Sequence, residues 1–292
     1  MTEKLYIRGM EVKIPKNHEG YFFGQHSTGY GNVWDAVLGV SEKLLVYLRM
    51  TMEKGIVVFK NLKTKNNQYA GIKYPEESDL SILNLIEEKK DSNVHASSYP
   101  LLIGINNEVK LKESYPWAIE GEGEMAAETD LGKIINFHNP YFAIENKNFK
   151  FNKIQTVSLA GLALSINKME VQEFPAEGDT YKHYLEEFLK ENPHKTEDDF
   201  EVPIHRIDAE HFRMFVPTDY CSEFEIATQI EEIKYVDFLG EKITVMKVNL
   251  EHSNDNEYLY CNIYASKHVL KDYKPQVGDG INAVIWMTGF FN

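Results

Sequence analysis

The chain has 292 residues, of which 43% are hydrophobic and 12% aromatic, and its 45 acidic and 31 basic residues give a formal net charge of −14. The length favours two domains, and the apolar content excludes wholesale disorder. The acidic balance argues against nucleic acid as a partner, because duplex binding needs lysine and arginine to neutralise phosphates. Basic proteins and metal ions fit the charge better, although acidity that serves only solubility also explains it.

The first 115 residues predict a mixed α+β domain, because short alternating runs mix with apolar residues at helical spacing. The predicted elements are a strand at 5–14, a helix from 33 to 48, strands at 55–62 and 69–74, a short helix at 78–89, a polar loop at 91–98 and a hairpin over 101–111. We expect this hairpin to turn at Asn106 and Asn107.

Tyr115-Pro116 marks the expected domain boundary, because proline biases its predecessor to extended geometry. Beyond it the sequence predicts mostly strands, at 119–129, 133–137, 141–149, 155–167, 224–233, 235–238, 243–250, 258–265 and 281–286. The run at 155–167 is small and apolar on both faces, which fits a central buried strand. A buried helix is the alternative, since periodicity alone does not separate the two.

Residues 173–211 interrupt the strand pattern with twelve acids against four bases, a net charge of −8. Within them, a helix is predicted from Asp179 or Thr180 until Pro193 stops it. Its apolar residues form one stripe: Tyr181, Tyr184, Leu185, Phe188 and Leu189. We therefore expect a charged insertion in a β-rich domain.

Histidines and carboxylates gather at the end of this insertion, where His205, Asp208, Glu210 and His211 lie within seven residues. Imidazole with carboxylate is the ligand set of zinc, manganese or iron(II), so the segment is a candidate divalent metal site. The spacing matches no compact metal motif. Alternate residues of a strand point apart, so solvated side chains on an acidic loop are the alternative.

Two glutamates two positions apart, Glu122 and Glu124, share a face of a predicted strand and could perform acid–base chemistry. A solvated outer face explains them equally well. The sequence contains no Gly-x-Ser-x-Gly elbow, and neither Cys221 nor Cys261 lies in a recognisable catalytic or metal-type signature. The sequence therefore favours a protein without enzymatic activity.

No signal peptide or membrane span is apparent. The N-terminus lacks an apolar stretch behind a basic start. The most apolar run, residues 157–166, is shorter than the roughly 20 residues that a membrane helix needs. Two cysteines in so long a chain suit a reducing compartment. We expect a cytoplasmic protein.

A faint internal repeat aligns residues 122–137 with 223–238 at a constant offset of 101. Two β-rich units could each begin with the same long strand. The alternative is that strands with acidic outer faces resemble one another without a repeat.

The closing run, Val277-Gly-Asp-Gly-Ile-Asn-Ala-Val-Ile-Trp286-Met-Thr-Gly289, resembles the ending of OB-like barrels in uncharacterised bacterial proteins. In those barrels a Gly-Asp turn leads into a final strand that carries a tryptophan and a late glycine. The resemblance includes the predicted hairpin over 223–250 and implies an OB-like barrel. It implies no catalytic residue.

The sequence thus predicts an α+β, β-rich fold: a mixed α+β domain at 1–115, then a β-rich domain at 116–292 with an acidic insertion at 173–211 and an OB-like barrel at 222–292. We expect a binding protein without a cofactor that recognises a protein partner through acidic, edge-rich β surfaces. A metal-dependent hydrolase that uses residues 205–211 is the alternative. A carbohydrate- or oligonucleotide-binding barrel is a third hypothesis.

Overall fold

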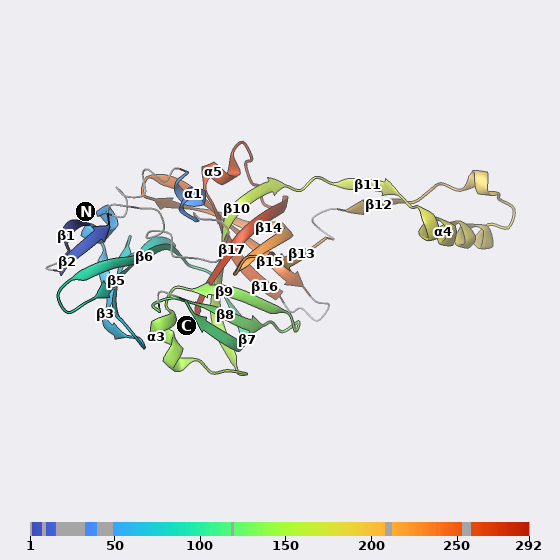
Figure 1. Cartoon of the computed structure of the whole chain (residues 1–292). Coiled ribbons are helices and arrows are strands. Elements are labelled where there is room, and N and C mark those ends of the chain that lie inside the picture. Colours follow the sequence, from blue (N-terminus) through green and yellow to red (C-terminus); the bar gives the residue numbers. More distant parts are fainter. Residues whose placement is uncertain are drawn as a thin grey trace.

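The computed structural model describes residues 2–7, 10–15, 33–39, 49–117, 120–207, 212–252 and 258–291. Strands dominate these residues and form two large sheets and one small ribbon (Figure 1). The β-rich character predicted from the sequence is confirmed. Within these ranges, no helix has the length and hydropathy of a membrane span.

The N-terminal part forms a six-stranded sheet. Its strands are β1 (Thr2–Ile7), β2 (Met10–Pro15), β3 (Ile56–Lys63), β4 (Gln68–Tyr74), β5 (Leu80–Glu88) and β6 (Asn93–Leu102). They lie in the order β1-β2-β6-β5-β4-β3. Helix α1 (Val33–Leu38) contacts β6, and residues 49–54 are also helical. The predicted strands at 55–62 and 69–74 are therefore confirmed as β3 and β4.

Three predictions in this part were wrong. Residues 5–14, predicted as one strand, contribute to two antiparallel strands, β1 and β2. Residues 78–89, predicted as a helix, form β5, and most of the predicted polar loop at 91–98 belongs to β6. Strand β5 lies inside the sheet, and Leu80–Ile86 are buried without interruption. A short apolar run that is buried on both faces has no alternation, so its pattern resembles that of a buried helix.

Ser98 of β6 is buried and bonds to residues of β5, β6 and α1. The Ser98 hydroxyl donates to Asn84 Oδ1 at 2.6 Å and lies 2.6 Å from His95 Nε2. The indole N–H of Trp34 in α1 donates to the carbonyl of Ser98 at 3.1 Å. Buried polar groups with partners are compatible with a core. The bonds to Asn84 and Trp34 join residues that are far apart in sequence, so the local sequence did not indicate that β6 is buried.

The second sheet has nine strands. They are β7 (Ile105–Pro116), β8 (Gly123–Glu128), β9 (Ile134–Asn139), β10 (Ile154–Lys168), β13 (Met214–Pro217), β14 (Glu223–Phe238), β15 (Glu241–His252), β16 (Tyr258–Ala265) and β17 (Gly280–Phe291). Besides the linear order, β14 pairs with β17 and β10 pairs with β7, so that eight of these strands close into a ring. Among the described strands, β13 pairs with β14 alone and forms the edge of the sheet.

The β10–β17 pair divides this ring into two rings of five strands, β7-β8-β9-β17-β10 and β14-β15-β16-β10-β17. Along one edge, β10 pairs first with β7 over Ile154–Leu159 and then with β16 over Ala160–Leu162. Strand β17 likewise pairs with β14 over Gly280–Trp286 and then with β9 at Thr288. Both strands are long because each pairs with strands of both rings.

The two rings share one topology. In the orders β10-β7-β8-β9 and β17-β14-β15-β16, the fourth strand of a unit returns to lie beside the first, which is a Greek key. A short helix precedes each fourth strand: α3 (Phe142–Glu145) before β10 and α5 (Lys267–Leu270) before β17. Each fourth strand also closes the other ring through a parallel pairing.

The structural repeat differs from the one that the sequence suggested. In the structure, β7 and β14 correspond, because each is the first strand of its four-strand unit. The sequence alignment of 122–137 with 223–238 instead matches β8 and β9 with β14. The parallel pairings Leu162–Tyr264 and His138–Thr288 are equivalent in the two units. The repeat is therefore real in topology, but the sequence match does not follow it.

Two further strand-level predictions were wrong. Strand β7 belongs to the second sheet, where it pairs with β8 and β10. Asn106 and Asn107 lie inside β7 and not in a turn. Residues 141–149 form α3 and the 3-10 turn η1 (Asn146–Asn148) instead of a strand. Asn107 bonds both backbone groups of Tyr260, which explains a turn-type residue in a strand.

One apolar core runs through both rings and reaches α1 and the N-terminal sheet. Trp286, Phe137 and Phe224 are fully buried in it. Gly289 of β17 lies beside β9 and β10, and a Cβ there would come within 2.9 Å of side chains of Leu159 and Phe137. A larger residue at this position would force these buried neighbours to shift.

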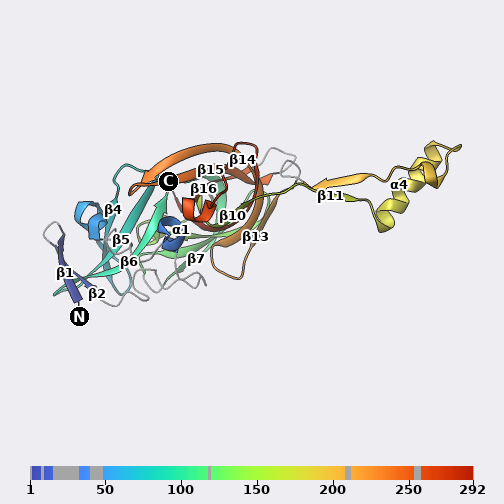
Figure 2. The ribbon, with the colours of Figure 1, turned by 90° about the horizontal axis from the view of Figure 1, so that it is seen from above.

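An arm leaves this body after β10 and points away from both sheets (Figures 1 and 2). It consists of the ribbon β11 (Gln172–Pro175) and β12 (Ile204–Ile207), the helix α4 (Gly178–Glu191) and the 3-10 turn η2 (Glu197–Asp199). The helix that the sequence predicted here is confirmed as α4. The arm carries the acidic segment away from the rings.

Candidate functional site

The arm has a small apolar cluster of its own. The ring of Phe200, which follows η2, lies 5.7 Å from Tyr181 and 5.3 Å from Phe188. His205 of β12 lies 5.9 Å from the ring of Tyr184. These contacts hold η2 and the ribbon against one face of α4, which is the predicted apolar stripe.

Local hydrogen bonds fix the far end of the arm. The Asp199 carboxylate accepts from the backbone N–H of Thr196 at 2.9 Å and from its hydroxyl at 3.2 Å, within a capping box. These bonds lower the pKa of Asp199. The Tyr181 hydroxyl donates to Glu197 at 3.0 Å, and this bond raises the pKa of the tyrosine. These bonds give the far end of the arm a defined local fold.

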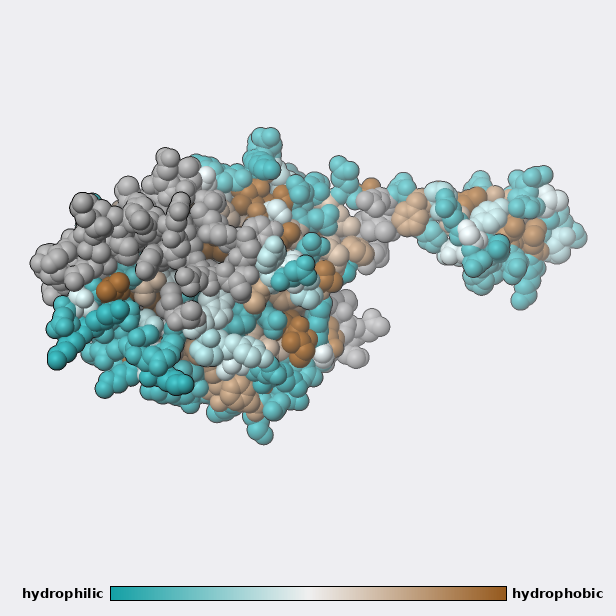
Figure 3. Space-filling model, viewed as in Figure 1, coloured by the Kyte–Doolittle hydropathy of each residue, from teal (hydrophilic) through white to brown (hydrophobic). Residues whose placement is uncertain are grey.

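The apolar residues of the arm remain largely uncovered. No residue of α4 is buried, and its apolar stripe is only half-buried. Phe174 is 43% exposed and Ile204 is 60% exposed, and Val171 and Val202 are exposed as well. Figure 3 shows hydrophobic residues interspersed among hydrophilic ones along the arm. Exposed apolar side chains that gather on one element are typical of an interaction surface.

The same element carries a dense negative charge. Residues 173–201 contain ten acids and three lysines. All ten acids are exposed: Glu173, Glu177, Asp179, Glu186, Glu187, Glu191, Glu197, Asp198, Asp199 and Glu201. The arm thus combines apolar contact area with a negative potential, and both are directed to solvent.

Of the four predicted metal ligands, the structure describes only His205. This residue lies on β12, half-buried, with its ring 5.8 Å from Phe174. Asp208, Glu210 and His211 fall outside the described residues. Within the described ranges, no group of three or more histidine, cysteine, aspartate or glutamate side chains is arranged to hold a metal ion. The metal site at 205–211 stays a prediction.

A second candidate site lies where the two rings meet, because Glu122, Glu124 and Glu223 are buried there. The interpretation of Glu122 and Glu124 as a solvated outer face was therefore wrong. The Ser222 hydroxyl donates to Glu124 Oε1 at 2.6 Å. Burial raises the pKa of Glu124 to about 7, and its bonds to Ser222 oppose that rise.

Glu122 contacts a buried histidine. Its Oε2 atom lies 2.9 Å from Nε2 of His138. The imidazole is surrounded by the rings of Tyr99, Trp117 and Trp286, at centroid distances of 5.1, 4.8 and 4.9 Å. Burial lowers the pKa of His138 to about 3, so the imidazole is neutral at physiological pH.

A carboxyl with a pKa near 7 can exchange protons at neutral pH, which is the property of a general acid or base. The bonds of Glu124, however, run from β8 of one ring to Ser222, which leads into β14 of the other. These buried carboxylates do not line any of the pockets described below. The bond between Glu124 and Ser222 indicates a role of this carboxyl in holding the rings together.

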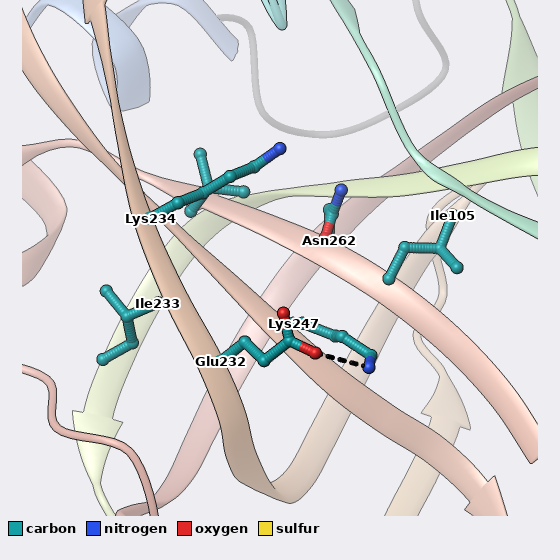
Figure 4. Close-up of a pocket in the computed structure, with 7 residues that line it drawn as sticks. Ile105, Glu232, Ile233, Lys234, Lys247 and Asn262 are labelled. Atoms are coloured by element: carbon teal, nitrogen blue, oxygen red, sulfur yellow. Dashed lines mark hydrogen bonds and ion pairs between the residues drawn. The ribbon is translucent and has the colours of Figure 1, made fainter.

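A pocket of about 310 Å³ opens on the face formed by β14, β15 and β16 (Figure 4). It is lined by Ile105, Glu232, Ile233, Lys234, Val245, Lys247 and Asn262. Lys247 pairs with Glu232 at 2.8 Å, and Lys234 pairs with Asp79. Both lysines of this pocket are therefore held in ion pairs.

Comparison with known proteins gave no match, whether to a family model, to a curated protein or to a solved structure. The function must therefore be inferred from the residues of this chain. The arm was visible in the sequence, because charge and helical periodicity are local signals. The burial of Glu122, Glu124 and Glu223 was not, because it depends on the meeting of distant strands.

Proposed function

We propose that this protein is a binding protein whose arm recognises a basic protein partner. The observation that carries the proposal is that an arm with ten exposed acids also exposes apolar side chains that nothing in the described structure covers. Aromatic and aliphatic residues in the centre of a charged patch are the usual anchors of a protein interface. The acids would steer a cationic partner to them and set the orientation of binding.

A second copy of this chain is a poorer occupant of the same surface. The segment 173–211 has a net charge of −8, and the whole chain has −14. Two such arms would repel one another, and like charges placed across an interface cost several kcal/mol. A partner with lysine and arginine around an apolar groove would match both the exposed acids and the exposed apolar side chains of the arm. An amphipathic helix in a groove is one recurrent form of such recognition.

We also propose that each five-strand ring is an OB-type barrel. Five strands, Greek-key order and one short helix per unit support it, and OB-type folds are small Greek-key barrels of five strands. The resemblance of residues 277–289 to such barrels falls on β17, which both rings share. In this view each barrel borrows its fifth strand from the other unit.

We further propose a cytoplasmic location. Cys221 is exposed and Cys261 is buried, and neither is in a disulfide. Burial raises the pKa of Cys261, so this thiol is unreactive. Two cysteines that form no disulfide suit a reducing compartment.

Site-specific photocrosslinking in the native cell tests the arm as the binding surface. A photoreactive amino acid replaces Ile204 on the arm, which is 60% exposed, or Ile154 on the rings, which is 63% exposed. We expect Ile204 to crosslink to a basic protein and Ile154 not to do so. The triple substitution Glu186→Gln, Glu187→Gln and Glu191→Gln should remove the crosslink. Equal crosslinking at both positions, or a crosslink that survives the triple substitution, would contradict the proposal.

A further inference from the structure

A second pocket, of about 510 Å³, lies between the β14–β15 hairpin and the segment from α5 to Pro275. This volume is within the range of about 300–1,000 Å³ that is typical of small-molecule sites. Its charged lining residues are Lys242, Lys267, Lys271, Lys274 and Glu241. Four cations therefore face one small cavity.

This concentration of lysine runs against the composition of the surrounding chain. Residues 223–292 contain eleven acids and only six lysines. Four of these six lysines line this one pocket, and Glu241 is the only acid among its lining residues. In a chain with a net charge of −14, a cavity with three excess positive charges is a local reversal of sign. Such a reversal raises the local concentration of anions.

The lysines come from three elements, and two of them are held in place. Lys267 of α5 pairs with Glu241 of β15 at 2.6 Å. The ammonium of Lys242 lies 3.6 Å from the centre of the Tyr235 ring, a cation–π contact. These contacts fix the two sides of the pocket before a ligand arrives, and preorganisation lowers the cost of binding.

The segment that carries the other two lysines is also fixed. Asp279 accepts from the hydroxyl of Tyr273 at 3.1 Å and from the backbone N–H of Gln276 at 3.0 Å, and it pairs with Lys168 at 2.6 Å. Lys271 and Lys274 flank Tyr273 and are exposed. Neither has an ion-pair partner among the described residues. They are the cations that remain available to a ligand.

We propose that this pocket binds a small phosphorylated ligand, with its phosphoryl groups between Lys271, Lys274 and the two fixed lysines. Lysine binds phosphate as a point charge, and a ligand with several negative charges uses several such charges at once. Tyr235 is 57% exposed at the rim and offers an aromatic surface to the rest of the ligand. The site is separate from the arm and does not depend on its function.

Calorimetric titration of the full chain with pyrophosphate at low salt tests this site. We expect saturable binding of one equivalent, weakened by about tenfold or more in Lys271→Gln/Lys274→Gln, since each tenfold corresponds to about 1.4 kcal/mol. Lys182→Gln/Lys190→Gln on the arm makes the same change in net charge and should leave the affinity within about twofold. All four lysines are exposed, so both variants should keep the melting temperature of the wild type.

Three results would overturn the inference. The first is the absence of saturable binding, and the second is an equal loss of affinity in the two double variants. The third concerns a single-stranded oligonucleotide used as a competing probe. If it binds more tightly than pyrophosphate and loses affinity in Lys271→Gln/Lys274→Gln, the pocket belongs to a nucleic-acid surface instead.

Discussion

The arm and the double ring place their aromatic residues in opposite environments. In the rings, Trp286, Phe137 and Phe224 are fully buried in a core that continues into the N-terminal sheet. On the arm, no residue of α4 is buried, although the helix carries an apolar stripe. Apolar side chains in the rings therefore stabilise the fold, whereas those on the arm contribute little to it. Apolar content alone therefore does not distinguish a core from an interaction surface.

The largest effect should come from truncating the shared strand. Trp286→Ala removes a fully buried side chain from β17, which serves both rings, and such changes cost about 3–5 kcal/mol. Phe188→Ala on α4 removes a half-buried ring and should change the free energy of global unfolding by less than about 1 kcal/mol. Chemical denaturation of both variants measures this contrast. Similar losses would mean that the arm is part of the core.

A smaller, pH-dependent effect should come from Glu124. Its pKa is about 7 in the folded protein against an unperturbed value of 4.5, so the folded state retains a proton that the unfolded state releases. The free energy of unfolding of the wild type therefore falls as the pH rises from about 4.5 to about 7. Glu124→Gln removes that loss, so the variant should gain up to about 3 kcal/mol relative to wild type between pH 4.5 and 7.

The control for this prediction lies on the arm. Glu201→Gln removes one exposed carboxyl, and its stability difference from wild type should stay flat over the same pH range. The comparison needs only denaturation curves at several pH values. A flat difference for Glu124→Gln would show that this carboxyl is solvated and that the rings do not bury it.

The smallest effect should be local to the arm. Thr196→Ala removes the capping box with Asp199, and a lost cap costs about 1 kcal/mol. Because the capping box bonds of this turn join residues of the arm to one another, we expect amide exchange at residues 197–200 to accelerate about fivefold. The melting temperature of the rings should not change. A lower melting temperature would place this turn within the cooperative fold.

The elements that could be predicted from the sequence are those with a pattern within their own residues. The small, apolar run of β10 predicted a central strand, and the apolar stripe and acidic flanks predicted α4. It mistook β5 for a helix, because a run buried on both faces shows no alternation. It placed Asn106 and Asn107 in a turn, because the partner of Asn107, Tyr260, is far away in sequence.

Local sequence patterns could not predict the double ring. Each ring takes its fifth strand from the other unit, and no pattern within either unit reveals an exchange. The lysine pocket was missed for the same reason, since its cations come from β15, α5 and the segment after α5. The predicted metal site shows that closeness in sequence is also insufficient. Four suitable residues within one short segment do not establish that their side chains converge on one point.

Hydrogen exchange across the isolated, full-length protein tests most directly whether the arm is a free binding element. We expect amides of α4 and of the ribbon β11–β12 to exchange through local opening, while those of β10 and β17 exchange only through global unfolding. Protection of the arm equal to that of β10 and β17 would contradict this. It would mean that the arm packs against the rings or a second copy and is not available to a basic partner.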